Sequence, residues 1–277
     1  MHVAQLWTYP VKSMIGRTVD TLALDELGVV GDRTWALREV ERDILANCRQ
    51  TPGIMQLSAS PDADGHVAIT TPAGDVIRSS APDADAQLSA ALGREVRLES
   101  LRPREDLEYY RSKSAPPEDL MGFLRDIFGR TDDEPLPDFA KFGEYAGAYQ
   151  SPPGTFYDCF PLMVMSTSAL RAMQEALPDS VIDVRRFRPS FVIDTGDEPG
   201  HPEFAWSGRR FRIGTAEIEV VNDCPRCASL TKEVTPDVPA DRAILRHVVK
   251  DLGQAVGVYC NVVVPGTVTQ GDELVQL

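Results

Sequence analysis

Two cysteines and an arginine lie close together at the end of an expected strand. The segment Asp223-Cys224-Pro225-Arg226-Cys227 follows the apolar run 216–221, which has the residue pattern of a strand. A guanidinium beside a thiol stabilises the thiolate and attracts anions. We therefore expect a metal site, a redox couple or a nucleophile at this point.

Spacing alone leaves several interpretations of Cys224 and Cys227 open. A zinc site needs a second ligand pair, but the other three cysteines stand alone in the sequence. A thioredoxin-like couple should open a helix, whereas residues 228–236 look extended. A single thiolate that ligates a metal cofactor with help from Arg226 is the third interpretation. Packing of two small buried side chains explains the pair about as well.

Three arginines in four residues, Arg185, Arg186 and Arg188, precede an apolar strand. The planar arginine fork matches phosphate in a bidentate way. Pro189 should hold Arg188 in extended geometry at the start of the strand. At least one of the three is expected on a solvated rim, where it balances nearby acids.

Two further cationic segments follow other expected elements. Lys12 and Ser13 come directly after the first strand and could hold an anion, although an ordinary loop explains them as well. Arg33 follows a tight turn at Gly31-Asp32 and precedes a strand, where pairing with Asp32 is the simpler outcome.

Composition limits the partners of this chain of 277 residues. The 42 acidic and 28 basic side chains leave a formal net charge of −14, which argues against nucleic acid as a partner. No apolar run approaches the length of a membrane span, and no signal peptide is visible. An odd number of cysteines in a chain of this length favours the reducing cytoplasm.

The elements that must position these side chains are mainly strands, with several helices, which predicts an α+β fold. Short strands separated by tight turns suggest a barrel or sandwich in the first hundred residues. Strands are expected at 3–9, 18–24, 34–38, 66–70, 95–99, 190–194, 209–213, 216–221 and 256–264. Helices are expected at 83–92, 117–128, from 166 or 167 onward, and at 241–252. We predict domains at 1–102 and 103–277, with 103–155 as a helical or loop insertion or connector.

In their order along the chain, these segments resemble the MOSC family, named for the C-terminal domain of molybdenum cofactor sulfurase. The first part resembles the N-terminal β-barrel domain that accompanies it. The resemblance covers nearly the whole chain and rests on five motifs: 9–13 (Tyr-Pro-Val-Lys-Ser), 31–35 (Gly-Asp-Arg-Thr-Trp), 186–189 (Arg-Phe-Arg-Pro), 224–227 (Cys-Pro-Arg-Cys) and 265–272.

The resemblance implies a β-barrel-like N-terminal domain, a MOSC β-barrel domain and a bound molybdenum cofactor, Mo-molybdopterin. It makes Cys227 the catalytic metal ligand. The positions that match its cofactor pocket are Lys12, Ser13, Arg33, Ser166, Thr167, Arg188, Ser190 and Arg226. Ser190 stands where the amidoxime reducing relatives have an asparagine. A thiolate suits a metal that is already bound by dithiolene sulfur.

The same resemblance implies a reductase of small N-hydroxylated compounds, namely amidoximes, hydroxylamines and N-oxides. No ferredoxin-type cysteine set follows the closing strand, so electrons are expected from a separate ferredoxin-, flavin- or cytochrome-type partner. The alternative is a sulfur-carrier or cofactor-delivery module that uses a cysteine persulfide.

Overall fold

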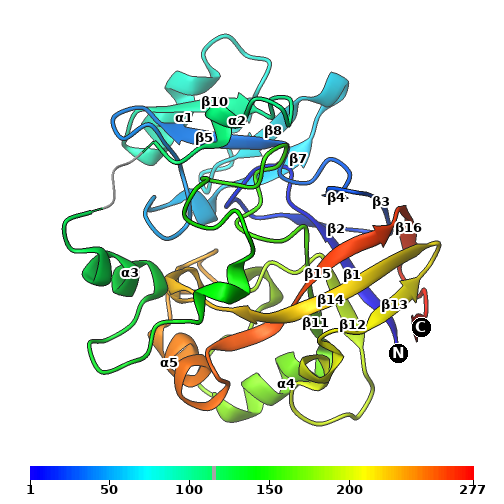
Figure 1. Cartoon of the computed structure of the whole chain (residues 1–277). Coiled ribbons are helices and arrows are strands. Elements are labelled where there is room, and N and C mark those ends of the chain that lie inside the picture. Colours follow the sequence, from blue (N-terminus) through cyan, green and yellow to red (C-terminus); the bar gives the residue numbers. More distant parts are fainter. Residues whose placement is uncertain (114–116) are drawn as a thin grey trace.

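The computed structural model describes residues 1–113 and 117–277 and is dominated by β-sheets (Figure 1). One sheet of eight strands and three sheets of three strands account for most of the regular structure of the described residues, and helices alternate with the strands along the chain. The predicted class, mainly β with several helices, is confirmed.

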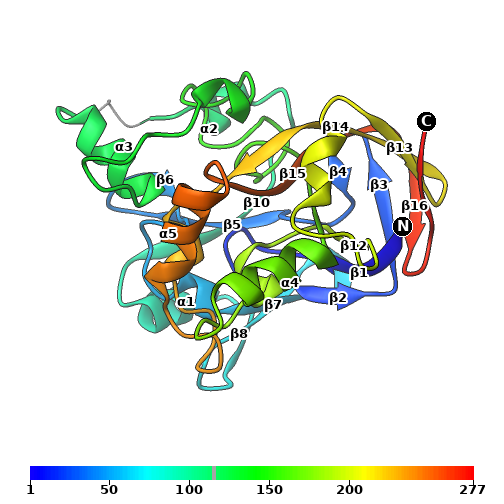
Figure 2. The ribbon, with the colours of Figure 1, turned by 90° about the horizontal axis from the view of Figure 1, so that it is seen from below.

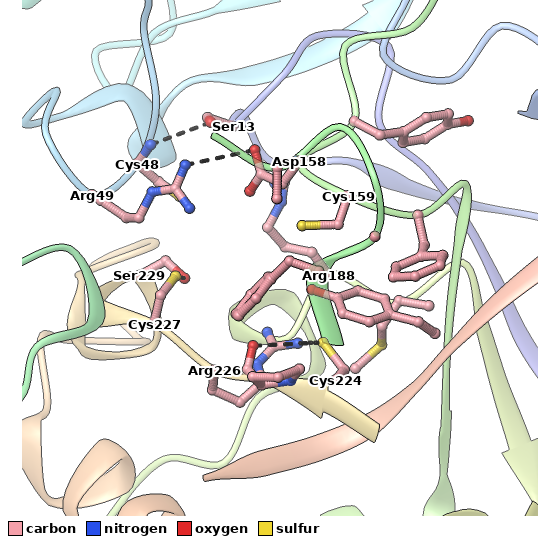
Figure 3. Close-up of a pocket in the computed structure, with 18 of the residues that line it drawn as sticks. Ser13, Cys48, Arg49, Asp158, Cys159, Arg188, Cys224, Arg226, Cys227 and Ser229 are labelled. Atoms are coloured by element: carbon pink, nitrogen blue, oxygen red, sulfur yellow. Dashed lines mark hydrogen bonds and ion pairs between the residues drawn. The ribbon is translucent and has the colours of Figure 1, made fainter. Parts of the chain in front are cut away.

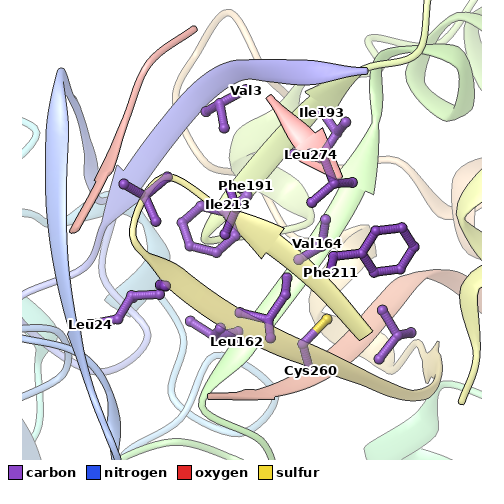
Figure 4. Close-up of a cluster of buried hydrophobic side chains, with 14 of the residues drawn as sticks. Val3, Leu24, Leu162, Val164, Phe191, Ile193, Phe211, Ile213, Cys260 and Leu274 are labelled. Carbon is purple, nitrogen blue, oxygen red and sulfur yellow. The ribbon is translucent and has the colours of Figure 1, made fainter. Parts of the chain in front are cut away.

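The eight-stranded sheet carries the cysteine motif. Its order is β17 (Leu274–Gln276), β13 (Arg210–Ile213), β14 (Ala216–Pro225), β15 (Ala255–Val264), β11 (Leu162–Ser166), β12 (Phe191–Asp194), β1 (His2–Thr8) and β2 (Arg17–Val19). Neighbours pair antiparallel except β11 and β12, which are parallel and are connected through α4 (Thr167–Ala176). Alternate residues of these strands form an apolar core that includes Phe191, Phe211 and Cys260 (Figure 4).

Three smaller sheets are built mainly from the first hundred residues. They are β10 (Val96–Ser100) with β5 (Trp35–Glu39) and β6 (Ile44–Leu45), β16 (Gly266–Thr269) with β3 (Thr21–Asp25) and β4 (Gly28–Val29), and β7 (Ser58–Pro61) with β8 (Val67–Thr70) and β9 (Val76–Arg78). A separate core under α1 (Ala84–Leu92) buries Leu37, Ile69 and Leu88.

The two ends of the chain pair with each other. β1 is hydrogen-bonded to β12, and β3 is hydrogen-bonded to β16, so N-terminal strands share sheets with C-terminal ones. This pairing brings the loop after β1 close to the loop before β12. The boundary at residue 102 stays a prediction.

The predicted connector holds two short helices and one turn of 3₁₀ helix: α2 (Leu107–Tyr110), α3 (Leu120–Phe128) and η3 (Phe139–Phe142). Residues 114–116 of the connector lie outside the described residues. The helix expected at 117–128 begins at Leu120, because the Asp119 carboxylate caps it by accepting from the Gly122 amide at 2.8 Å. Gly129, with φ 62°, ends it in left-handed geometry.

Two other helices follow their predictions closely. α4 begins after Ser166, and α5 (Arg242–Asp251) begins after Asp241, whose carboxylate accepts from the Ala243 amide. Figure 2 shows these two helices on the same side of the molecule. Within the described ranges, no helix combines the length and apolar character needed to cross a bilayer.

Two strand predictions need correction. The strand expected at 216–221 continues to Pro225, so Cys224 lies inside β14 and only Arg226 and Cys227 follow it. Register shifts near Asn222 and Asp223 indicate β-bulges. The bulges interrupt the alternation of apolar and polar residues, although the strand itself continues. The strand expected at 18–24 is divided at Asp20 into β2 and β3, which belong to different sheets.

Candidate functional site

A cavity of about 550 Å³ collects most of the candidate residues from distant parts of the sequence (Figure 3). Six of the nine predicted site residues line it: Lys12, Ser13, Arg33, Arg188, Arg226 and Cys227. The loop after β1, the turn before β5, the segment before β12 and the end of β14 all deliver side chains to one place.

The two cysteines of the motif have different surroundings. Cys224 is buried, and its sulfur accepts a hydrogen bond from Arg226 Nη1 at 3.0 Å. Cys227 is partly exposed to the cavity, with its sulfur 3.1 Å from Ser229 Oγ (Figure 3). Arg226 is itself fixed, because its Nη2 donates to the Phe187 carbonyl at 2.8 Å. Cys227 therefore presents the accessible sulfur, and Arg226 holds the buried one.

Three cavity residues that are not glycine have positive φ angles: Ser13 at 67°, Arg33 at 46° and Arg188 at 59°. This left-handed conformation is costly for most side chains and concentrates at functional sites. The expectation that Pro189 keeps Arg188 extended is wrong. The Arg188 amide bonds to the Val184 carbonyl at 3.2 Å, so the residue ends a helical turn before the chain enters β12.

Arg33 and Arg188 both stack on Tyr9, with their guanidinium carbons 4.9 and 4.4 Å from the ring centroid. Arg33 pairs with Asp32, as the simpler sequence interpretation proposed. Arg188 donates through Nη1 to the Met14 carbonyl, while its buried Nη2 has no hydrogen-bond partner among the described residues. Burial and the charge of Arg33 lower the pKa of Arg188. An unpaired buried donor of this kind is suited to an anion.

A second cluster of charges surrounds Asp158. Lys12 Nζ donates to the Asp158 carboxylate and to the Phe156 carbonyl at 2.9 Å. Arg49 Nη2 lies 3.8 Å from Asp158 Oδ1, and Figure 3 shows these two side chains facing each other. Burial alone would raise the pKa of Asp158, but Lys12 and Arg49 hold that pKa well below its usual range. Burial also lowers the pKa of Lys12, which Asp158 only partly offsets. With two cations and one carboxylate, this group keeps an excess of positive charge in the cavity lining.

Sequence analysis missed several residues that line this cavity. Asp158, Arg49, Cys48 and Cys159 lie in loops with no recognisable pattern, and they reach the cavity only through the fold. Burial and Asp158 raise the pKa of Cys159 to about 12, so its thiol stays protonated near neutral pH. A basic residue after an apolar strand was the signal for Lys12, and Arg49 offers no such signal.

Ser166, Thr167 and Ser190 do not line the cavity. Ser166 Oγ caps α4 by accepting from the Ala169 amide at 2.9 Å, and it donates to the buried Glu203 carboxylate at 2.5 Å. Thr167 Oγ1 lies 3.5 Å from Asp194 Oδ1, and Ser190 Oγ accepts from the Met163 amide at 3.5 Å. These hydroxyls form hydrogen bonds that connect β11, α4 and β12. Serine and threonine are favoured both as helix caps and as anion contacts, so residue type alone does not separate the two roles.

The three neighbouring arginines have three different environments. Arg185 pairs with Asp183 at 2.8 Å and Asp237 at 3.0 Å, as expected of a residue on a rim. Arg186 is fully buried and donates to backbone carbonyls, including that of Lys232 at 2.9 Å. Only Arg188 reaches the cavity.

The connector segment also holds the cysteine motif in place. Arg130, which is buried, donates through Nη2 to the Arg226 carbonyl at 3.0 Å and to Gln254 Oε1 at 3.1 Å. Burial and the neighbouring Arg246 lower the pKa of Arg130 to about 10. The same segment supplies apolar cavity residues, namely Leu124, Phe128, Phe139 and Phe142.

No three His, Cys, Asp or Glu side chains of residues 1–113 and 117–277 converge as a metal-binding group. A protein site made only of such ligands therefore has no support here. The cavity instead combines partly exposed thiols, among them Cys227, with several cationic side chains. This arrangement suits an anionic group that brings its own ligands.

Comparison with known proteins matches both parts of the chain. Residues 1–113 match the MOSC N-terminal beta barrel domain, and residues 152–275 match the MOSC domain. The chain is 25% identical over 246 residues to bovine (Bos taurus) mitochondrial amidoxime reducing component 2, covering 85% of this chain and 67% of that protein. The human (Homo sapiens) protein of the same name is 25% identical over 250 residues, with the same coverage.

Among solved structures, the YUAD protein from Bacillus subtilis aligns with 99% of this chain and 93% of its own, at 12% identity and a TM-score of 0.43. The two family models match adjacent parts of the chain in the order N-terminal domain, then MOSC domain. The chain is a member of the MOSC-domain proteins that also carry the MOSC N-terminal β-barrel domain.

Proposed function

We propose that this protein binds a molybdenum cofactor in the cavity and reduces small N-hydroxylated compounds, such as amidoximes and hydroxylamines. The observation that carries the proposal is that Cys227 and five cationic side chains line one cavity of about 550 Å³; the cations are Lys12, Arg33, Arg49, Arg188 and Arg226. Its relatives named amidoxime reducing components support the type of reaction.

The residues present fit such a group. The unpaired buried Nη2 of Arg188 offers a donor to an anion, and Lys12 and Arg33 supply further positive charge to a pterin phosphate. Asp158 forms ion pairs with Lys12 and Arg49, so a phosphate that enters the cavity would compete with this carboxylate for both cations. The accessible Cys227 thiolate would ligate the metal, whereas Arg226 keeps Cys224 away from it.

When bound, the molybdenum centre would supply the oxygen-accepting redox chemistry. The chain's own residues would orient the cofactor and offset the negative charge of its phosphate. We also propose that electrons come from a separate redox protein of the ferredoxin, flavin or cytochrome type.

The test is purification from a host that makes the cofactor, followed by molybdenum analysis and pterin fluorescence. Reduction of an amidoxime is then measured with a chemically reduced viologen as electron donor. We expect stoichiometric molybdenum and turnover. Absence of molybdenum and of turnover would refute the proposal, and a persulfide on Cys227 or Cys224 without molybdopterin would favour the sulfur-carrier alternative.

A matched pair of variants tests the phosphate contact. Arg188→Ala should lose most of the bound cofactor, because it removes a guanidinium that lines the cavity and would donate to the phosphate. Arg185→Ala removes the same side chain three residues away, where it pairs only with rim groups, and should retain cofactor. Equal cofactor content in the two variants would contradict the assignment of Arg188.

A further inference from the structure

The cavity is also lined by aromatic side chains that have no role in the proposed cofactor contacts, and we call them the aromatic wall. They come from the connector and from the chain at β11 and β15. The connector supplies Phe128, Phe139 and Phe142, and the sheet side supplies Phe160 and Tyr259.

The connector rings form one compact group. Their centroids lie 5.5 Å apart for Phe128 and Phe142, 5.9 Å for Phe128 and Phe139, and 6.0 Å for Phe139 and Phe142. The second group is the stacked pair of Phe160 and Tyr259, with centroids 4.8 Å apart. These distances are typical of favourable aromatic pairs, so each group holds its shape.

The two groups meet at Gly143, directly after Phe142. A Cβ at Gly143 would lie 3.6 Å from the Phe160 ring, so the connector backbone rests on that ring. Ion pairing between Lys141 and Asp223, at 3.5 Å, fixes the same turn against β14 just before the cysteine motif. The aromatic wall is therefore tied to the part of the chain that carries Cys227.

These rings are not ordinary core packing. Phe139 is 45% exposed, and Phe142 and Phe160 are only partly buried. Phe142 and Phe160 also line a second cavity of about 300 Å³ that adjoins the first. Aromatic side chains that border open space on both sides retain free surface for a flat apolar group.

We propose that this aromatic wall binds an aryl substituent of the substrate and that Phe142 is a specificity-determining residue. The proposal rests on the proposed function for the position of the reacting N-hydroxyl group, which would face Cys227. Substrates with a flat, uncharged aromatic group would then be preferred over small aliphatic ones.

The test compares phenyl amidoxime with methyl amidoxime in the wild type and in Phe142→Leu, which keeps apolar volume but removes the ring. The ratio of kcat/KM for phenyl to methyl substrate should fall roughly 3- to 10-fold in the variant, as expected for loss of one aromatic contact. Phe123→Ala is the control, since Phe123 is an exposed ring of α3 that does not line the cavity, and it should leave the ratio unchanged.

A binding measurement separates this inference from the proposed function. Titration calorimetry of phenyl and methyl amidoxime with the oxidised protein, without electron donor, reports binding in the absence of turnover. Tighter phenyl binding that Phe142→Leu weakens supports the aromatic site, even if added donor produces no reduction and the proposed function fails. Equal affinity for the two compounds in the wild type, or an unchanged phenyl preference in Phe142→Leu, would overturn it.

Discussion

Replacing Arg130 by methionine should both destabilise the protein and loosen the cysteine motif. Arg130 is the buried guanidinium that connects the connector to the Arg226 carbonyl and to Gln254 Oε1, and it also donates to the Phe128 carbonyl within the connector. Methionine preserves much of the apolar stem but leaves two buried carbonyls and one half-buried amide oxygen without this donor. Because Arg226 directly precedes Cys227, its carbonyl is the point where the connector controls the position of the thiol.

The size of the effect follows from these contacts. Each buried acceptor left unpaired costs about 1–3 kcal/mol, and removal of a buried cation recovers part of that by relieving desolvation. We therefore expect the free energy of unfolding to fall by about 2–4 kcal/mol in Arg130→Met. Urea unfolding followed by circular dichroism measures the loss.

A second readout reports on the motif itself. The rate at which a thiol reagent modifies Cys227, followed by peptide mass spectrometry, should rise in Arg130→Met. Arg125→Met is the matched control, because Arg125 also donates to carbonyls, of Thr131 and Glu134, but only within its own segment. A loss below about 1 kcal/mol with unchanged labelling of Cys227 would refute the reasoning. Equal acceleration in Arg125→Met would refute it as well.

Three further predictions concern other parts of the chain. Since the pKa of Asp158 is lower in the folded protein than its ordinary value near about 3.9, the charged carboxylate stabilises the fold above that pH, and this contribution is lost on acidification. Asp158→Asn should therefore reduce the fall in the free energy of unfolding as the pH drops from about 5 to 2, and an unchanged slope would contradict the assignment. Ser166→Ala removes the α4 cap and a partner of Glu203, so it should cost about 2 kcal/mol in urea unfolding yet leave molybdenum content unchanged; parallel loss of molybdenum would place Ser166 in the site after all. Arg186→Met strips several buried carbonyls of their donor and should cost about 3 kcal/mol or more, whereas a value near zero would mean that water replaces the guanidinium.

Local patterns in the sequence were sufficient for most elements of the fold. The 3.6-residue spacing and capping residues of α5 predicted its ends within one residue, and the alternation around β5 and β8 identified those strands. The end of β14 was missed because bulges break the alternation on which the prediction depends. Very short strands such as β6 have too few residues to carry a pattern.

The site was predictable only where residue type and position agreed. Lys12 and Arg188 combine a basic side chain with a strand end, and the fold brings both to the cavity. Asp158 contacts Lys12 across 146 positions of sequence, and Arg130 contacts the Arg226 carbonyl across 96. Such pairs depend on tertiary packing, which no local pattern encodes.

Ser166 shows how one residue type can serve two roles, and its contact to a cofactor stays a prediction. Its hydroxyl stands at a helix start, where both anion binding and capping favour serine, and in the structure it caps α4 and bonds Glu203. The side-chain chemistry was suitable for the predicted role, but the direction of the side chain was not available from sequence.

The most direct test of the central claim is X-ray absorption at the molybdenum edge for the wild type, Cys227→Ala and Cys224→Ala. Cys227 is the more accessible of the two sulfurs in the motif, and Cys224 is buried beside Arg226. We predict that Cys227→Ala has one sulfur ligand fewer than the wild type, or loses the metal, while Cys224→Ala keeps the full set of sulfur ligands. An unchanged sulfur count in Cys227→Ala, or loss of a sulfur ligand only in Cys224→Ala, would contradict the account.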